Sequence, residues 1–261
     1  MESCDFLSLL KEHGQMPAAP AAAVEMHGDG VQGAEGTTIL ALRYGAGVLV
    51  AGDRRATMGN VVVYDRADKV LCIDDDAVMA LSGSPAIAVE VARMLEVSFQ
   101  HYRRSQLQEL SLDGKLRILS RLLRENLPMA VQGIGAVVPI FAAFDAAAAS
   151  GKIFFYDILG AQFESVDFCT TGSGSPIIRG ALYHLNRWGD QPLASMDERT
   201  SLTLILKMLE TAAEYDTATG GYKPSARIYP QVMRITADGI DAVAEPELEA
   251  LYRTALGAAA D

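Results

Sequence analysis

The chain has 261 residues, of which 50% are hydrophobic and 21% are charged. This composition is typical of a globular protein and excludes a collagen, a wholly disordered chain and a disulfide-stabilised miniprotein. The formal net charge of -11 argues against a nucleic-acid partner, because nucleic acids are polyanions and the sequence has no long basic run.

The cysteines, histidines and apolar runs give no sign of export, metal binding or a membrane. The three cysteines are scattered, as expected of reduced thiols in the cytoplasm, and the four histidines show no metal-ligand spacing. The N-terminus is acidic, unlike a secretory signal, and the longest apolar run (134–144) is too short for a bilayer span of ~18 residues. We therefore expect a soluble, cytoplasmic protein with no membrane partner.

Residues 1–36 differ in composition from the rest of the chain. They hold six acidic residues against one lysine, include an alanine-rich run and show only weak periodicity. We interpret them as a leader that precedes a folded domain at 37–261. The alternative is a terminus without a specific role.

The first half of the domain is predicted to form strands and then two helices. Strand patterns cover 37–43, 48–51, 61–64, 70–73 and 78–81. The acidic triplet Asp74–Asp76 falls between the last two, and we interpret it as a turn rather than a metal site. Apolar stripes predict helices around 87–95 and 116–123, the second closed by Pro128.

The second half repeats this order. Strands are predicted at 136–144, 152–158 and 163–169, followed by a helix that starts at Ser175–Pro176 and a second over 197–214. Strands at 228–235 and 240–243 and a helix over 245–258 complete the chain. Helices in pairs between groups of strands favour an α+β fold in which two antiparallel sheets pack together with helices outside.

Short motifs of other enzyme classes are absent from the sequence. There is no G-x-S-x-G, H-E-x-x-H or Walker sequence. The segment Gly172–Ser175 precedes a helix but lacks the remainder of a phosphate-binding motif, so a tight strand-to-helix turn is the better interpretation.

Five segments in order resemble the catalytic β subunit of the bacterial proteasome. They are GTTILALRYGAGVLVAGDRRATMGN (36–60), Lys69–Val70 with Ser82–Gly83, NLPMAVQG (126–133), TGSGS (171–175) and YDTATGG (215–221). The first is highly specific, and the resemblance extends to about residue 258. It implies an N-terminal nucleophile hydrolase with a four-layer αββα sandwich, a threonine endopeptidase that needs no cofactor or metal.

The resemblance also implies how the nucleophile is made. Self-cleavage of the Gly36–Thr37 bond would expose Thr37, whose hydroxyl attacks the substrate while its new α-amine accepts the proton. Such an amine has a pKa of ~7.7–8.0, so a useful fraction is neutral near physiological pH. Lys69 matches the lysine beside the nucleophile, and Asp53 the carboxylate that orients this lysine.

Further residues match supporting roles in the family. Ser173, Asp216 and Thr219 match the group that positions the new terminus and a water, although the family often has serine at the last position. Gly83 matches the residue whose N–H stabilises the tetrahedral oxyanion.

Four residues match the substrate cleft, namely Ala56, Thr57, Leu81 and Pro85. Leu81 suggests a preference for apolar side chains. Pro85 departs from the family pattern, because proline cannot offer a backbone N–H to the substrate.

The implied partners are α subunits, other β subunits in seven-membered rings (α7β7β7α7), an ATPase ring and polypeptide substrates. Three alternatives remain at this stage. They are a non-catalytic structural β subunit, the simpler bacterial relative with six-membered double rings, and a small-molecule amidase of the same superfamily.

Overall fold

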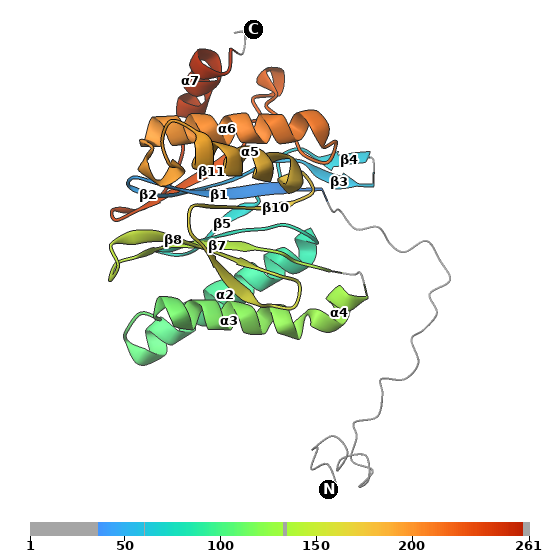
Figure 1. The fold of residues 1–261 in the computed structure, drawn as a ribbon. Helices are drawn as coiled ribbons and strands as arrows, with labels where there is room; N and C mark the ends of the chain where they lie inside the picture. The colour runs from blue at the N-terminus through green and yellow to red at the C-terminus, as the bar shows by residue number, and fades with distance from the viewer. Residues whose placement is uncertain (1–35, 60, 133–134, 258–261) are drawn as a thin grey trace, which may run out of the picture. The chain divides into compact units, whose positions relative to one another are not determined.

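The structure is a computed structural model that describes residues 36–59, 61–132 and 135–257. The predicted leader, apart from Gly36, lies outside the described residues. Two five-stranded antiparallel sheets are stacked between two layers of helices (Figure 1). None of the described helices combines the length and the apolar character that crossing a membrane would require.

The first sheet has helices on its outer face. In spatial order its strands are β10 (Phe168–Gly172), β1 (Thr38–Tyr44), β2 (Gly47–Gly52), β11 (Gln231–Thr236) and β12 (Gly239–Ala242). The covering helices are α5 (Ser175–Trp188), α6 (Glu198–Tyr215) and α7 (Glu245–Ala255). Short 3-10 helices, η1 (Leu193–Ser195) and η2 (Pro224–Ala226), lie in the connections.

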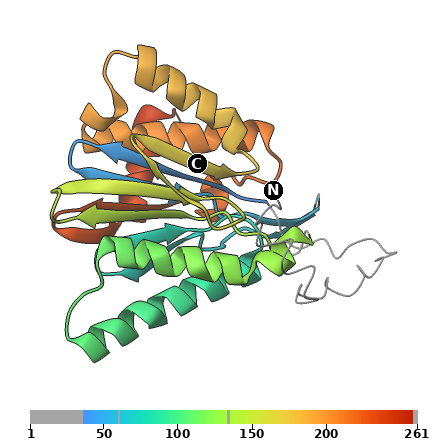
Figure 2. The same ribbon diagram turned by 60° about the horizontal axis from the view of Figure 1, so that its bottom comes forward.

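The second sheet is built in the same way. Its strands are β5 (Val70–Asp74), β6 (Ala77–Ala80), β7 (Ile140–Asp145), β8 (Ser150–Tyr156) and β9 (Gln162–Ser165). Helices α2 (Pro85–Gln106) and α3 (Leu112–Glu125) run side by side on its outer face (Figure 2), followed by the short α4 (Leu127–Val131). A separate hairpin consists of β3 (Ala56–Met58) and β4 (Val61–Tyr64). The predicted α+β sandwich is confirmed.

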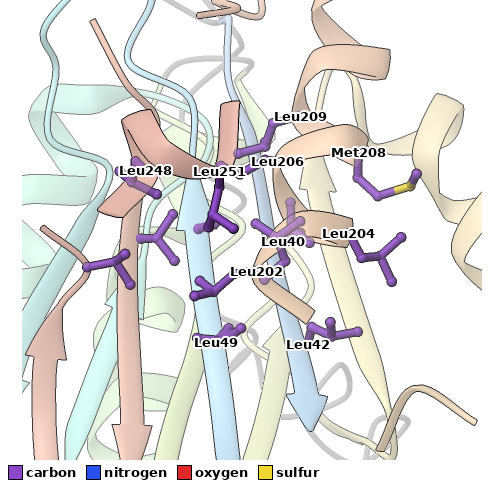
Figure 3. Packing of buried hydrophobic residues seen from close by; sticks show 14 of the residues in the cluster. Leu40, Leu42, Leu49, Leu202, Leu204, Leu206, Met208, Leu209, Leu248 and Leu251 are labelled. Atoms are coloured by element: carbon purple, nitrogen blue, oxygen red, sulfur yellow. The ribbon is translucent and has the colours of Figure 1, made fainter. Parts of the chain in front are cut away.

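The alternation of side chains along β1 explains why the strand is apolar throughout. Leu40 and Leu42 point toward the helices and pack with leucines of α6, as Figure 3 shows. Ile39 and Ala41 point the other way and pack between the two sheets. Because successive strand residues face opposite sides, a strand in the middle of four layers must be apolar on both.

One predicted strand, 163–169, is wrong. Strand structure is interrupted at Val166 and Asp167, which separate β9 from β10. Strand β9 belongs to the second sheet and β10 to the first. Asp167 lies where the chain passes from the second sheet to the first, and its carboxylate pairs with the Arg43 guanidinium at 3.1 Å. A single pattern of strand formers cannot reveal that the chain passes from one sheet to the other.

Other predicted boundaries were shifted by prolines. Strands β7 and β11 begin only after Pro139 and Pro230, which lack the N–H that a ladder needs. Pro128 does not close α3, which ends at Glu125, but lies in the first turn of α4. The helix predicted from Ser175–Pro176 begins at Ser175, and Gly174 is its N-cap. Strand β3 was not predicted.

The acidic triplet lies at the predicted turn between β5 and β6: Asp74 ends β5, and Asp75 and Asp76 form the turn. The Asp74 carboxylate is paired with the Lys115 ammonium at 2.7 Å and also contacts Arg103, and Asp76 contacts Lys115 as well. Burial alone would raise the pKa of Asp74, but the hydrogen bond and charge of Lys115 outweigh it and lower the pKa. The triplet therefore holds α3 and α2 against the sheet through basic side chains.

Candidate active site

The predicted site residues lie at one end of the two sheets because of the strand register. Thr38 is opposite Gly172 in β10, and Ile39 is opposite Gly52 in β2. The segments that follow these glycines therefore bring Ser173 and Asp53 to either side of the start of β1. In the second sheet, Leu81 N donates to Lys69 O at 2.8 Å, which fixes the start of β5 beside the end of β6.

Thr37 and Lys69 meet at the carbonyl group of Gly36. The Thr37 hydroxyl donates a hydrogen bond of 2.6 Å to the Gly36 carbonyl oxygen, and Lys69 Nζ donates one of 3.2 Å to the same oxygen. All three groups are buried. The hydroxyl, the ammonium and the bond predicted to be cut are thus in contact.

Asp53 forms a buried ion pair with Lys69. The Lys69 Nζ–Asp53 Oδ1 distance is 2.6 Å, and backbone N–H groups of Thr38, Arg55 and Gly220 also donate to the carboxylate. Burial lowers the pKa of Lys69 below its ordinary value, although the Asp53 carboxylate opposes this shift. Taken alone, an aspartate and a lysine are most simply interpreted as an exposed ion pair of little energetic value. The burial of both side chains excludes that interpretation here.

Ser173, Asp216 and Thr219 form one hydrogen-bond network beside Thr37. Ser173 Oγ lies 3.1 Å from Thr37 O and 3.4 Å from Thr37 N, and it donates to Asp216 Oδ2 at 2.6 Å. Thr219 Oγ1 donates to the same carboxylate oxygen at 2.6 Å. The Thr219 hydroxyl also forms a hydrogen bond of 2.5 Å with the Thr38 hydroxyl. Its contact with the start of β1 is therefore made to Thr38 and not to Thr37.

Gly83 lies directly after β6 in a left-handed conformation, with a φ of 101°. Its neighbours Ser82 and Ser84 carry the hydrogen bonds to the facing segment at Ala136 and Val138. The Gly83 N–H therefore points away from that segment, and it has no acceptor among the residues that the structure describes. A free donor in this position is what an oxyanion needs.

The four predicted cleft residues have different surroundings. Thr57 is buried against Gly36, and Ala56 beside it is half-buried. Leu81 is only 5% exposed and packs in the core beneath α2. Pro85 is exposed as the first residue of α2, where a helix leaves N–H groups unpaired in any case, so a proline here removes no helical hydrogen bond.

Sequence reasoning missed two residues that hold the site together. The Arg55 guanidinium donates to the carbonyl oxygens of Thr217 and Thr219, which ties their loop to Asp53. The Gln231 side chain accepts from the N–H groups of Lys69 and Val70 and donates to Val70 O, as a neighbouring strand would. The position of Arg55 within the specific segment 36–60 was the one sequence feature that could have indicated its role. No sequence feature indicated the role of Gln231.

Gly36 is required by close packing. A Cβ atom at this position would lie 2.3 Å from Thr57 Oγ1, 2.5 Å from Ala218 Cβ and 2.9 Å from Ala218 O. Gly36→Ala must therefore move the carbonyl group away from Lys69 and Thr37. We expect cleavage after residue 36 to slow by about 100-fold, as misplacement by ~1 Å commonly does, which a time course of intact mass measures.

Gly180→Ala provides the matched control for this variant. Nothing lies within 4 Å of a Cβ at that position in α5, so the same added methyl should leave processing unchanged. Processing of Gly36→Ala at the rate of the unmodified chain would show that the packing around Gly36 is irrelevant to cleavage.

The fold and the site together define a class of protein. A four-layer αββα sandwich with threonine, lysine and carboxylate at the start of an inner strand is the arrangement of N-terminal nucleophile hydrolases. The family described as "Proteasome subunit" matches residues 34–222. The chain belongs to the proteasome subunit family.

Curated relatives agree with this family. "Proteasome subunit beta 2" of Thermomonospora curvata is 42% identical over 223 residues, which cover 85% of this chain and 77% of the relative. "Proteasome subunit beta" of Acidothermus cellulolyticus is 40% identical over 241 residues, covering 91% and 78%. The protein of the same name from Streptomyces griseus is 37% identical over 226 residues, covering 87% and 78%.

Among the described residues, no group of three or more histidine, cysteine, aspartate or glutamate side chains is placed to hold a metal ion. Of the two described cysteines, Cys169 is buried, and burial raises the pKa of its thiol to about 12. Neither finding bears on the threonine chemistry.

Proposed function

We propose that this chain is the catalytic β subunit of a proteasome core particle, a threonine endopeptidase that becomes active by cutting its own Gly36–Thr37 bond. The observation that carries the proposal is the convergence of the Thr37 hydroxyl and the Lys69 ammonium on the Gly36 carbonyl oxygen, at 2.6 and 3.2 Å. Residues 1–36 are then the propeptide and residues 37–261 the peptidase.

Self-cleavage requires an attack within one peptide unit. The Thr37 oxygen attacks the carbonyl carbon of Gly36, an ester bond forms, the Gly36–Thr37 C–N bond breaks, and the hydroxyl proton passes to the released nitrogen. Water then hydrolyses the ester, which returns the hydroxyl to Thr37 and leaves a carboxylate on Gly36. Lys69 assists by polarising the carbonyl group that its ammonium contacts.

Peptide hydrolysis repeats this chemistry on a substrate. The Thr37 amine accepts the hydroxyl proton and later gives it to the leaving amine, while the Gly83 N–H stabilises the oxyanion. Asp53 keeps Lys69 in place through the 2.6 Å ion pair. Ser173 and Asp216 hold the new terminus through the hydrogen bonds that already reach Thr37 N and O.

The assembly follows from the same proposal. The β subunits form seven-membered rings between rings of α subunits (α7β7β7α7) in the cytoplasm, and an ATPase ring delivers unfolded polypeptides. Ala56, Thr57 and Pro85 border the cleft on the acyl side of the scissile bond, and the buried Leu81 is its apolar base, which favours apolar side chains. The names of the curated relatives support the assignment of this chain as a β subunit.

The second candidate function is a non-catalytic β subunit that maintains the ring but never matures. The contacts among Thr37, Lys69 and Asp53 argue against it, because a structural subunit has no use for a buried ammonium beside its leader junction. Burying an ion pair costs desolvation free energy, and apolar residues of similar size would fill the same space without that cost.

Intact mass and N-terminal sequencing of the chain co-expressed with its α partner test the proposal. We expect residues 1–36 to be lost and the chain in the assembled particle to begin at Thr37. A particle that retains the full-length chain would favour the structural alternative.

A further inference from the structure

A cavity of about 500 Å³ lies next to the site, on the side of Gly83 and Gly172. Gly172 is opposite Thr38 in the sheet, and a Cβ at Gly172 would lie 2.1 Å from Thr37 O, so this wall of the cavity touches the nucleophile residue. The other walls come from small residues of the segment after β6, from the segment before β7, and from the start of α5.

The position of Gly36 shows which half of a substrate the cavity would receive. In the precursor, Gly36 carries the carbonyl group to be attacked, and it packs against Thr57 and Ala218. The acyl half of a substrate must lie on that same side, because the same hydroxyl attacks both carbonyl groups. Neither Thr57 nor Ala218 lines the cavity, which faces Gly83 and Gly172 instead. It is therefore placed to receive the half that leaves as an amine.

Arg179 gives this cavity its charge. Among the described residues of the lining it is the only charged one, and the remainder are glycine, alanine, valine, serine and threonine. Its side chain projects from the second turn of α5, is exposed, and makes no ion pair with a carboxylate of the described residues. The small neighbours leave room for a substrate side chain to reach the guanidinium, and Ser84, Thr170 and Ser175 add hydroxyl groups.

We propose that this cavity is the subsite for the first two substrate residues after the scissile bond, and that Arg179 makes it prefer an acidic side chain there. The proposal rests on the peptidase function proposed above. A guanidinium pairs with a carboxylate through parallel hydrogen bonds that a neutral amide or an ammonium cannot replace. Without the leader, residues 37–261 carry a formal net charge of -6, because 27 acidic residues face 21 basic ones. This charge would repel acidic substrates, so a cation at this point has a marked local effect.

The test compares peptides on the assembled particle. Internally quenched peptides share one apolar acyl half and carry glutamate, glutamine or lysine in the two positions after the cut. We expect kcat/KM for the glutamate peptide to exceed that for the glutamine peptide by about fivefold, as expected of a partly exposed charge pair. Arg179→Ala should remove this difference, and Arg179→Glu should favour lysine.

Two controls separate the subsite from general effects. A peptide with the same acyl half and a coumarin leaving group has no residue after the cut, so its turnover should not change in either Arg179 variant. Arg187→Glu makes the same charge change on the exposed surface of α5 but outside the cavity lining, and should keep the glutamate preference.

The outcomes distinguish the two proposals. A glutamate preference that persists in Arg179→Ala, while the coumarin peptide is hydrolysed normally, would overturn the subsite and leave the peptidase intact. Failure of the unmodified particle to hydrolyse any peptide would overturn the peptidase and the subsite with it. If Arg179→Glu does not assemble, Arg179→Ala carries the test, since it removes the charge without adding another.

Discussion

Thr37→Ala is expected to assemble with its α partner, to keep residues 1–36 attached, and to lose hydrolysis of apolar fluorogenic peptides by about 10⁴-fold or more. The reason is that this substitution removes the attacking oxygen of both proposed reactions. Within the described part of the chain the hydroxyl makes one hydrogen bond, to Gly36 O, so its loss should cost little stability. Intact mass reports processing, and initial rates on purified particles report hydrolysis.

Thr37→Ser is the matched control for the nucleophile. Serine keeps the hydroxyl and, after cleavage, the α-amine, but it loses the methyl group that restricts the side-chain rotamer. We expect processing and turnover within about tenfold of the unmodified chain, because only rotamer freedom changes. Hydrolysis by Thr37→Ala particles at the rate of the serine variant would remove Thr37 from the mechanism.

Lys69→Met is expected to abolish processing and turnover and also to destabilise the subunit by about 3 kcal/mol. Methionine is similar in length but leaves Asp53, which is fully buried, without its counter-charge. Three backbone N–H groups still donate to the carboxylate, which favours the lower end of the usual range for a broken buried pair. Denaturant unfolding measures the stability, and peptide hydrolysis per assembled particle measures the activity.

Lys115→Met separates the two effects of this change. Lys115 is likewise buried and paired with Asp74, but it belongs to α3, and its ammonium contacts the turn between β5 and β6, away from Thr37. The same substitution should lower stability by a similar amount while turnover per assembled particle stays normal. Normal turnover in Lys69→Met would contradict the electrostatic role of Lys69.

Local patterns were sufficient to predict most of the fold, whereas the resemblance to the proteasome family named the proposed site residues. Strands such as β1 and β2 are apolar on both faces, and the helices carry one apolar stripe each, so their type and order follow from the period of the side chains. The segment 36–60 was specific enough to single out Thr37 and Asp53 before any contact was known.

Only the tertiary structure decided how these residues meet. The crossing between β9 and β10, the burial of the Lys69–Asp53 pair and the space that excludes a side chain at Gly36 all involve atoms from distant segments. Arg55 and Gln231 owe their roles to the same cause, since their partners lie more than 150 positions away in the chain. A period along the chain records which face of an element is buried, whereas long-range contacts depend on how the sheets stack.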